Sequence, residues 1–165
     1  MSSSIDLKAL LRDPNIVSLF RGRSPAHNDL NADIHLDADD LVVMDVPYQS
    51  RFSISEETQM LHPGVVMTAM DSAMGLATII NLDEFSSLAT LELRYDQLRA
   101  SDKESSVSVV ATFKSLHDDL AYVTACANDA AGVFARATAR FILTPADSGF
   151  IESALTMLAE DEAPS

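Results

Sequence analysis

The segment His62–Gly75, HPGVVMTAMDSAMG, decides the fold, because it is the most apolar stretch of a strongly acidic chain. The 165 residues include 25 acidic and 11 basic side chains, yet between Pro63 and Ile80 the only charge is Asp71. Proline suits the first turn of a helix, where its missing N–H is not needed. The sequence therefore predicts one long helix that begins at Pro63 and runs to Ile80.

The predicted helix is apolar on nearly all sides, so most of its surface must be buried. Burial in lipid is disfavoured, because a span needs about 20 apolar residues and a carboxylate near its centre is costly. Asp71 stands at that centre, and no basic flank marks a cytoplasmic end. One sheet covers only one side of a helix, so a second copy of the chain is expected to cover the rest. The sequence thus favours a homodimer at least.

Charge and composition exclude several partners. The net charge of −14 argues against nucleic acid and against anionic membranes, because phosphate contacts require Lys and Arg. A small anionic ligand remains compatible, since a few local arginines suffice for it. The amino terminus lacks the basic-then-apolar pattern of a signal peptide, which favours a cytoplasmic protein. The single cysteine, Cys126, excludes an intramolecular disulfide and a thiolate metal cluster, and it is expected to be a small buried hydrophobe.

The rest of the chain is expected to flank this helix with strands. Residues 1–30 read as a helical extension that ends in a loop over 23–33, and residues 146–165 as a helix with an acidic tail. One or two strands are predicted over 31–54. Four more are predicted over 90–98, 105–116, 120–129 and 133–143, and short turns would join them as an antiparallel meander.

Alternation within the predicted strands indicates which face each residue occupies. Leu91, Leu93 and Tyr95 fall on one face of the first of these four strands. In the last strand, a row of small and aromatic residues opposes a row of polar ones. The first row is Ala135, Ala137, Ala139 and Phe141, and the second is Arg136, Thr138 and Arg140. A face of alanines lets a helix approach the sheet closely, which predicts an α+β fold with the helix on the concave face of a curved sheet.

Three segments carry a resemblance to a known family. They are LHPGVVMTAMDSAMGLA (61–77), TLELRYDQLRA (90–100) and LAYVTACANDAAGVFARATARFIL (120–143). Together they resemble the PaaI-like acyl-CoA thioesterases of the hotdog fold, over roughly residues 31–143. The resemblance implies a hotdog domain at 31–145 that hydrolyses an acyl-CoA to free acid and CoA, with no cofactor beyond the CoA of the substrate. Related hotdog dehydratases also have PGV before the helix, but their acid would fall at Ala69 here, so hydrolysis is favoured.

The resemblance also assigns candidate catalytic residues. Asp71 lies nine residues after His62, which is the register of the family's catalytic carboxylate, acting as nucleophile or general base. Thr90 matches a Ser or Thr at the start of the next strand, where it would hold water or orient Asp71. The family usually has glycine after the histidine, and its N–H polarises the carbonyl, whereas this chain has Pro63. Gly64 N–H and the His62 ring are the expected substitutes.

Substrate-binding candidates follow from the same resemblance. The family often has asparagine where this chain has Glu56, and the amide of Gln59 is the expected replacement. The CoA phosphates need cations, for which the candidates are Arg99, Arg136 and Arg140. No metal site is expected, because no ligands cluster at a metal-binding spacing. The remaining histidines, His27, His35 and His117, are expected to be solvated turn residues.

Two function classes remain open. The first is an acyl-CoA thioesterase that uses Asp71. The second is a non-catalytic hotdog protein that binds an acyl group or serves in assembly, with an oxyanion hole impaired by Pro63. Asp71 and Thr90 favour the enzyme, whereas Pro63 and Glu56 favour the binding protein.

Overall fold

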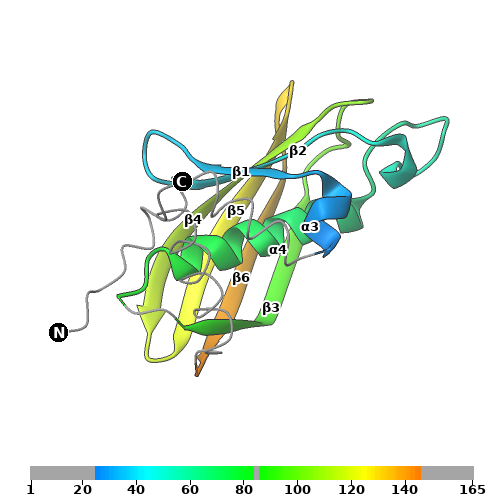
Figure 1. Cartoon of the computed structure of the whole chain (residues 1–165). Helices are drawn as coiled ribbons and strands as arrows, with labels where there is room; N and C mark the ends of the chain where they lie inside the picture. Colours follow the sequence, from blue (N-terminus) through cyan, green and yellow to red (C-terminus); the bar gives the residue numbers. More distant parts are fainter. Residues whose placement is uncertain (1–24, 84–85, 146–165) are drawn as a thin grey trace, which may run out of the picture.

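The computed structural model describes residues 25–83 and 86–145 (Figure 1). The terminal helices expected within 1–24 and 146–165 lie outside these residues, and the proposed domain boundaries stay predictions. The described elements are α3 (Pro25–Leu30), β1 (Asp33–Leu36), β2 (Val42–Val46), the 3-10 helix η1 (Ser50–Phe52), α4 (Pro63–Ile79), β3 (Ser87–Gln97), β4 (Val107–His117), β5 (Leu120–Asp129) and β6 (Gly132–Thr144).

Helix α4 begins at Pro63 as predicted and lies across a curved six-stranded antiparallel sheet (Figure 1). His62 is its N-cap residue, and Ile80 is its C-cap. The face toward the sheet is built from Val66, Ala69, Met70, Ala73, Met74, Leu76, Ala77 and Thr78, all buried. These side chains form the centre of the core, so the helix fixes the curvature of the sheet around it.

The sheet does not have the predicted meander. Its strand order is β1-β2-β4-β5-β6-β3, so of the four strands expected to form the meander only β4, β5 and β6 lie side by side in chain order. Strand β3 pairs with β6, and Ser87 lies opposite Thr144. The loop over residues 98–106, which follows β3, is too long for a tight hairpin. It carries the chain to β4, which pairs with β2 and not with β3. Strand β3 is therefore an edge strand.

Alternation along β4 and β6 is confirmed. Val107, Val109 and Ala111 of β4 are buried toward the helix, as are Ala135, Ala137, Ala139 and Phe141 of β6. The other face of the sheet is turned away from α4 and carries Arg136, Thr138 and Arg140, all exposed. Cys126 is only half-buried and belongs to this outer face of β5, so the prediction that it is buried in the core is wrong.

The loop predicted over 23–33 is wrong at residues 25–30, where α3 forms. Pro25 occupies the first helical position, where its fixed φ favours a helix. Leu30, at the other end, is 4% exposed and joins the core. This short helix packs near the start of α4, and it contributes to the candidate site described below.

Candidate active site

One stripe of α4 stays open to solvent. Gly64, Met67 and Thr68 are exposed, and Asp71 and Ser72 are half-buried. These positions recur every three or four residues, which places them along one side of the helix. Ala69, where a hotdog dehydratase would have its acid, is fully buried against the core. The lone carboxylate of α4 therefore lies on the accessible side, where a substrate can reach it.

Asp71 is held by Thr90 of β3. Thr90 Oγ1 donates a hydrogen bond to Asp71 Oδ1 at 2.9 Å. The register of β3 against β6 shifts between Thr90 and Glu92, so Leu91 is an extra residue. Because of this β-bulge, Thr90 faces α4 together with Leu93, although the two are an odd number of residues apart. No described residue donates to Asp71 Oδ2, so this oxygen is available to a water molecule or a substrate.

His62 holds the first turn of α4 through its ring. Gly64 N–H donates to His62 Nδ1 at 3.0 Å. A neutral imidazole that accepts at Nδ1 carries its proton on Nε2, so the ring presents an Nε2–H donor to its surroundings. A Cβ on residue 64 would stand 3.1 Å from Nδ1, which explains the glycine there. The N–H of Gly64, expected as a replacement donor, is therefore already engaged.

Within one chain, His62 and Asp71 lie far apart. They are separated by nine residues of helix, which at about 1.5 Å per residue is about 13 Å along the axis. Groups that act on one carbonyl must each approach it to about 3 Å. One carbonyl therefore cannot contact the His62 ring and the Asp71 carboxylate of the same chain.

Gln59 and Glu56 lie in the loop before α4. The Gln59 amide donates to Glu104 Oε1 at 2.7 Å, and Glu104 N–H donates back to the Gln59 carbonyl at 2.9 Å. These bonds dock the loop onto residues 98–106 and engage the Gln59 amide there. Glu56 is exposed. Neither residue is brought next to Asp71.

Arg99 is bound within the protein. Its guanidinium donates to both carboxylate oxygens of Asp129, at 2.8 and 2.5 Å, and to the Gly132 carbonyl at 2.8 Å. The Asp129 side chain is fully buried, and the hydrogen bond from Arg99 lowers its pKa to about 2. This pair joins residues 98–106 to the β5–β6 turn, where Gly132 has a φ of +103°. Arg99 therefore has a structural role and is not free to hold a phosphate.

Arg136 and Arg140 lie on the outer face of the sheet, away from α4. Arg140 forms an ion pair with Glu92 of β3. Arg136 is opposite Asp96 in the strand register, but the Asp96 carboxylate pairs with Arg94. Among residues 25–83 and 86–145, Arg136 has no ion pair. The two arginines share one face of β6 but stand four residues, about 13 Å, apart along the strand. This face is the one turned away from α4 and Asp71.

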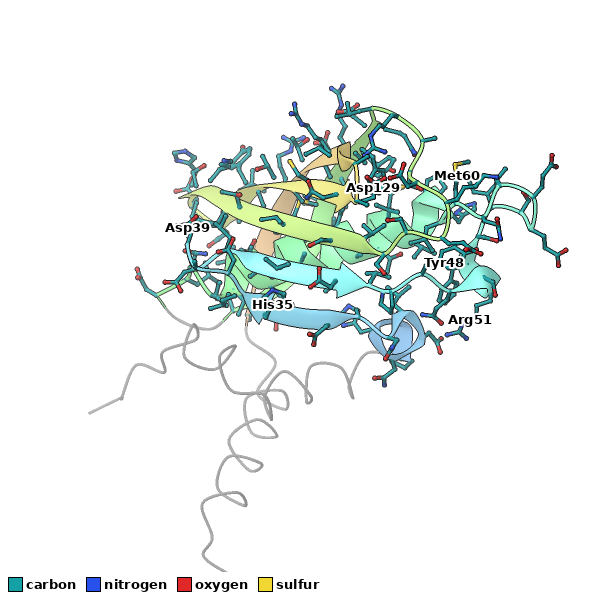
Figure 2. All side chains as sticks on the ribbon, turned by 90° about the horizontal axis from the view of Figure 1, so that it is seen from above. His35, Asp39, Tyr48, Arg51, Met60 and Asp129 are labelled. Carbon is teal, nitrogen blue, oxygen red and sulfur yellow. The ribbon has the colours of Figure 1, made fainter. Side chains whose placement is uncertain are left out.

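His27 is not the solvated turn residue that the sequence predicts. It lies on α3, where its Nε2 is 2.7 Å from Ser72 Oγ of α4. Burial lowers the pKa of His27. The contact spans 45 residues of sequence and depends on how α3 packs on α4, so no local pattern could have predicted it. His35, on β1, is exposed and lies 3.8 Å from Asp45 of β2 (Figure 2).

An open cavity of about 320 Å³ lies between α3, η1 and the start of α4. Its apolar walls include Ala26, Leu30, Phe52 and Val65, and its polar lining includes His62 and Thr68. In the part of the chain that the structure describes, no group of three or more His, Cys, Asp or Glu side chains could hold a metal ion. No helix within those ranges is long and apolar enough to cross a membrane.

Solved structures confirm the predicted fold. A thioesterase from Haemophilus influenzae superposes with a TM-score of 0.71 at 16% identity, covering 81% of this chain and 91% of that one. The PaaI protein of the Escherichia coli phenylacetic acid degradation operon gives a TM-score of 0.69 at 13% identity, covering 87% and 98%. A thioesterase family protein from Silicibacter pomeroyi gives 0.67 at 23% identity, covering 84% and 98%. No protein-family model and no curated protein matches the chain.

These comparisons establish the fold class. The chain shares the hotdog fold of these solved structures, with one long helix on a six-stranded antiparallel sheet. At such low sequence identity the likeness is one of fold, so the activity of this chain must be argued from its own residues.

Proposed function

We propose that this protein is a thioesterase that hydrolyses acyl-CoA to the free acid and CoA, with Asp71 as its catalytic carboxylate. The carrying observation is the Asp71–Thr90 pair on the open stripe of an otherwise buried helix. The fold does not require a carboxylate at this position of α4, and Asp71 Oδ2 accepts no hydrogen bond from a described residue. The fold that this chain shares with named thioesterases supports the same chemistry.

The proposed reaction begins at the free oxygen of Asp71. As a general base, Oδ2 removes a proton from water, and the resulting hydroxide attacks the thioester carbonyl carbon. As a nucleophile, Oδ2 attacks that carbon itself and forms an anhydride, which water then hydrolyses. In both routes the C–S bond breaks, the CoA thiolate leaves, and it takes up a proton. Thr90 keeps the carboxylate oriented in either route.

His62 is the proposed oxyanion donor. Pro63 has no N–H, and the N–H of Gly64 is used by the His62 ring. The N–H of Val65 donates to the His62 carbonyl at 2.9 Å, so it is also engaged. The Nε2–H of His62 is the remaining donor at this end of α4. A donor aimed at the developing oxyanion contributes about 10²–10³ in turnover.

The proposed active site is shared between two copies of the chain. The separation of about 13 Å along α4 prevents His62 and Asp71 of one chain from acting on one carbonyl. A two-fold partner can bring its Asp71 to the first chain's His62, and this arrangement creates two equal sites per dimer. The edge of β3 offers unpaired backbone groups and an exposed Leu91, at 60%, beside Thr90. We therefore propose a homodimer as the minimal active unit, and a homotetramer as a dimer of dimers.

Arg136 and Arg140 remain the proposed partners for the CoA phosphates, whereas Arg99 is left out because Asp129 holds it. The two arginines lie on the outer face of the sheet, so they can serve only a CoA that extends around the edge strand. The Arg140–Glu92 pair would have to open for such a contact.

A panel of aromatic and aliphatic acyl-CoA substrates, followed by release of free thiol, tests the function. Turnover that disappears in the Asp71→Asn protein supports the thioesterase. The second candidate function, a non-catalytic acyl-binding or assembly protein, is favoured by Pro63, because it removes the family's usual donor. Binding of acyl-CoA without release of thiol would favour that second function.

A further inference from the structure

We propose that the cavity beneath α3 is the acyl pocket and that it restricts the protein to small, uncharged acyl groups. This inference rests on the proposed function and adds its substrate class. His62 lies in the wall of the cavity. A thioester carbonyl held at His62 Nε2 therefore has the cavity beside it, and its acyl chain can lie against Leu30, Phe52 and Val65.

The size of the cavity sets the length of the acyl group. Ligand pockets commonly span 300–1,000 Å³, and this one, at about 320 Å³, lies at the small end. A cavity of about 150 Å³ holds a benzene molecule, so this one has room for about twice as many carbon atoms. Acyl chains of about ten carbons or fewer, and single-ring aryl-acyl groups, fit within it. Longer chains must leave part of their length in water.

The wall formed by α3 is fixed in place. His27 of α3 contacts Ser72 of α4 at 2.7 Å. The Gln49 amide donates to the carbonyls of the last two residues of α3, at 3.1 and 2.9 Å. Arg51, which lies beside this end of α3 (Figure 2), donates to the Asp29 carbonyl. Side chains thus satisfy carbonyls that a helix end leaves unpaired, and α3 cannot lift without breaking these bonds.

Phe52 forms the wall opposite α3 and is itself held. The Arg51 guanidinium carbon lies 4.5 Å from the centre of the Phe52 ring, within the range of a cation–π contact. The ring is half-buried and packs against the core. Phe52 therefore limits the cavity on the side of η1.

Charge disfavours acyl groups that end in a carboxylate. Asp29 also lines the cavity, and the chain as a whole has a net charge of −14. Among the described residues, no lysine or arginine lines the cavity to offset that charge. A carboxylate at the end of the acyl group would be repelled and would lose its hydration without gaining a partner.

Binding of alkyl-CoA thioethers, which cannot be hydrolysed, tests the pocket apart from catalysis. Calorimetry on the full-length protein with chains of 2 to 16 carbons should show affinity rising about threefold to fourfold per methylene. The rise should stop at about eight to ten carbons. A thioether with a terminal carboxylate should bind at least tenfold more weakly than its methyl-ended analogue. A rise that continues to 16 carbons would overturn the proposal.

Three variants locate the limit. The break point is the chain length at which affinity stops rising. Phe52→Ala should move it to longer chains, and Ala26→Phe, on an exposed residue, should move it to shorter ones. Leu116→Ala, which removes an exposed leucine of β4 outside the cavity, should leave it unchanged. Melting curves identify a Phe52→Ala protein that does not fold, and Ala26→Phe then decides alone. An unchanged break point in the folded cavity variants would refute the assignment.

The outcomes separate this inference from the proposed function. A break point that moves in the variants, in a protein that hydrolyses no acyl-CoA, keeps the pocket and removes the enzyme. Hydrolysis of acyl-CoA with no break point keeps the enzyme and removes the pocket.

Discussion

Thr90 Oγ1 donates a hydrogen bond to Asp71 Oδ1 at 2.9 Å, which joins the edge strand of the sheet to the open stripe of the helix. The bond exists because the bulge at Leu91 turns Thr90 toward α4. It uses one carboxylate oxygen and leaves the other for chemistry. The position of Asp71 is thus set by both the helix and the strand, which is the kind of support that a catalytic group requires.

Asp71→Asn should abolish catalysis and preserve the fold. Asparagine keeps the size of the side chain and can still accept the Thr90 hydrogen bond, but it is neither a base nor a nucleophile. Turnover of the best acyl-CoA should fall by about 10²–10⁴, and the melting temperature should stay within about two degrees, because the side chain is only half-buried. Thiol release and thermal denaturation measure the two quantities. Unchanged turnover would exclude Asp71 from the mechanism.

Thr90→Val tests the positioning role of the hydroxyl. Valine has a similar shape but cannot donate to Asp71, so kcat should fall about tenfold while KM changes little. Thr90→Ser restores a hydroxyl and should recover most of the lost kcat. If the serine protein is as slow as the valine protein, the methyl group rather than the hydrogen bond is what matters.

His62→Asn separates the cap from the proposed oxyanion donor. Asparagine is a good N-cap residue, so the first turn of α4 and the melting temperature should be retained. The Nε2–H is lost, and turnover should fall by about 10²–10³. A His62→Asn protein that keeps full turnover would show that the oxyanion is held elsewhere.

The matching gain-of-function change is Pro63→Gly, which adds the N–H that the family usually has. It should raise turnover at least tenfold, in the wild-type chain and in the His62→Asn chain. Replacing proline should cost about 0.4–1 kcal/mol of unfolding free energy, because glycine frees the unfolded chain. Unchanged turnover in both backgrounds would mean that an amide at this position does not face the substrate.

Asp129→Asn tests whether the ion pair between Arg99 and Asp129 stabilises the fold in a pH-dependent way. The pKa of Asp129 falls from 3.8 to about 2 in the folded protein, chiefly through its hydrogen bond from Arg99. A lowered pKa stabilises the fold above pH 3.8, and this stabilisation is lost as the pH falls toward 2. Urea denaturation at fixed protein concentration should show that Asp129→Asn lowers the free energy of unfolding by roughly 1–2 kcal/mol at pH 7. This range allows for the partial exposure of Arg99. The difference should shrink near pH 2, whereas a constant difference would point to packing instead.

The sequence predicts those features that depend on local patterns. Pro63 and the apolar run after it predicted α4, and alternation predicted the buried face of β6. The resemblance added Asp71 and His62 as candidates and gave Thr90 two alternative roles, to hold water or to orient Asp71. Neither source predicted the place of β3 beside β6, because strand order depends on contacts between distant segments.

Three site features escaped prediction for the same reason. The bulge at Leu91 is a mismatch in length between two strands, so one strand alone cannot reveal it. The contact of His27 with Ser72 requires α3 to fold against α4. The engagement of Gly64 N–H by the His62 ring depends on a rotamer, and it changes which donor remains available.

The shared active site makes the most specific prediction. Asp71→Asn and His62→Asn chains should each be nearly inactive as homodimers. In a heterodimer of the two, one site combines the intact His62 of one chain with the intact Asp71 of the other, and the second site lacks both. Heterodimers purified with two affinity tags should therefore recover about half of the wild-type turnover per dimer.

The recovered turnover distinguishes a site shared between two chains from a site within one chain. If His62 and Asp71 act within one chain, every site of the heterodimer lacks one group, and no activity returns. A heterodimer of wild-type and doubly substituted chains is the matched control. In the shared geometry each of its sites combines one intact and one substituted residue, so it should be nearly inactive, whereas in the single-chain geometry it should keep half of the turnover. Opposite results in the two heterodimers would assign the active site to one chain and overturn the shared site.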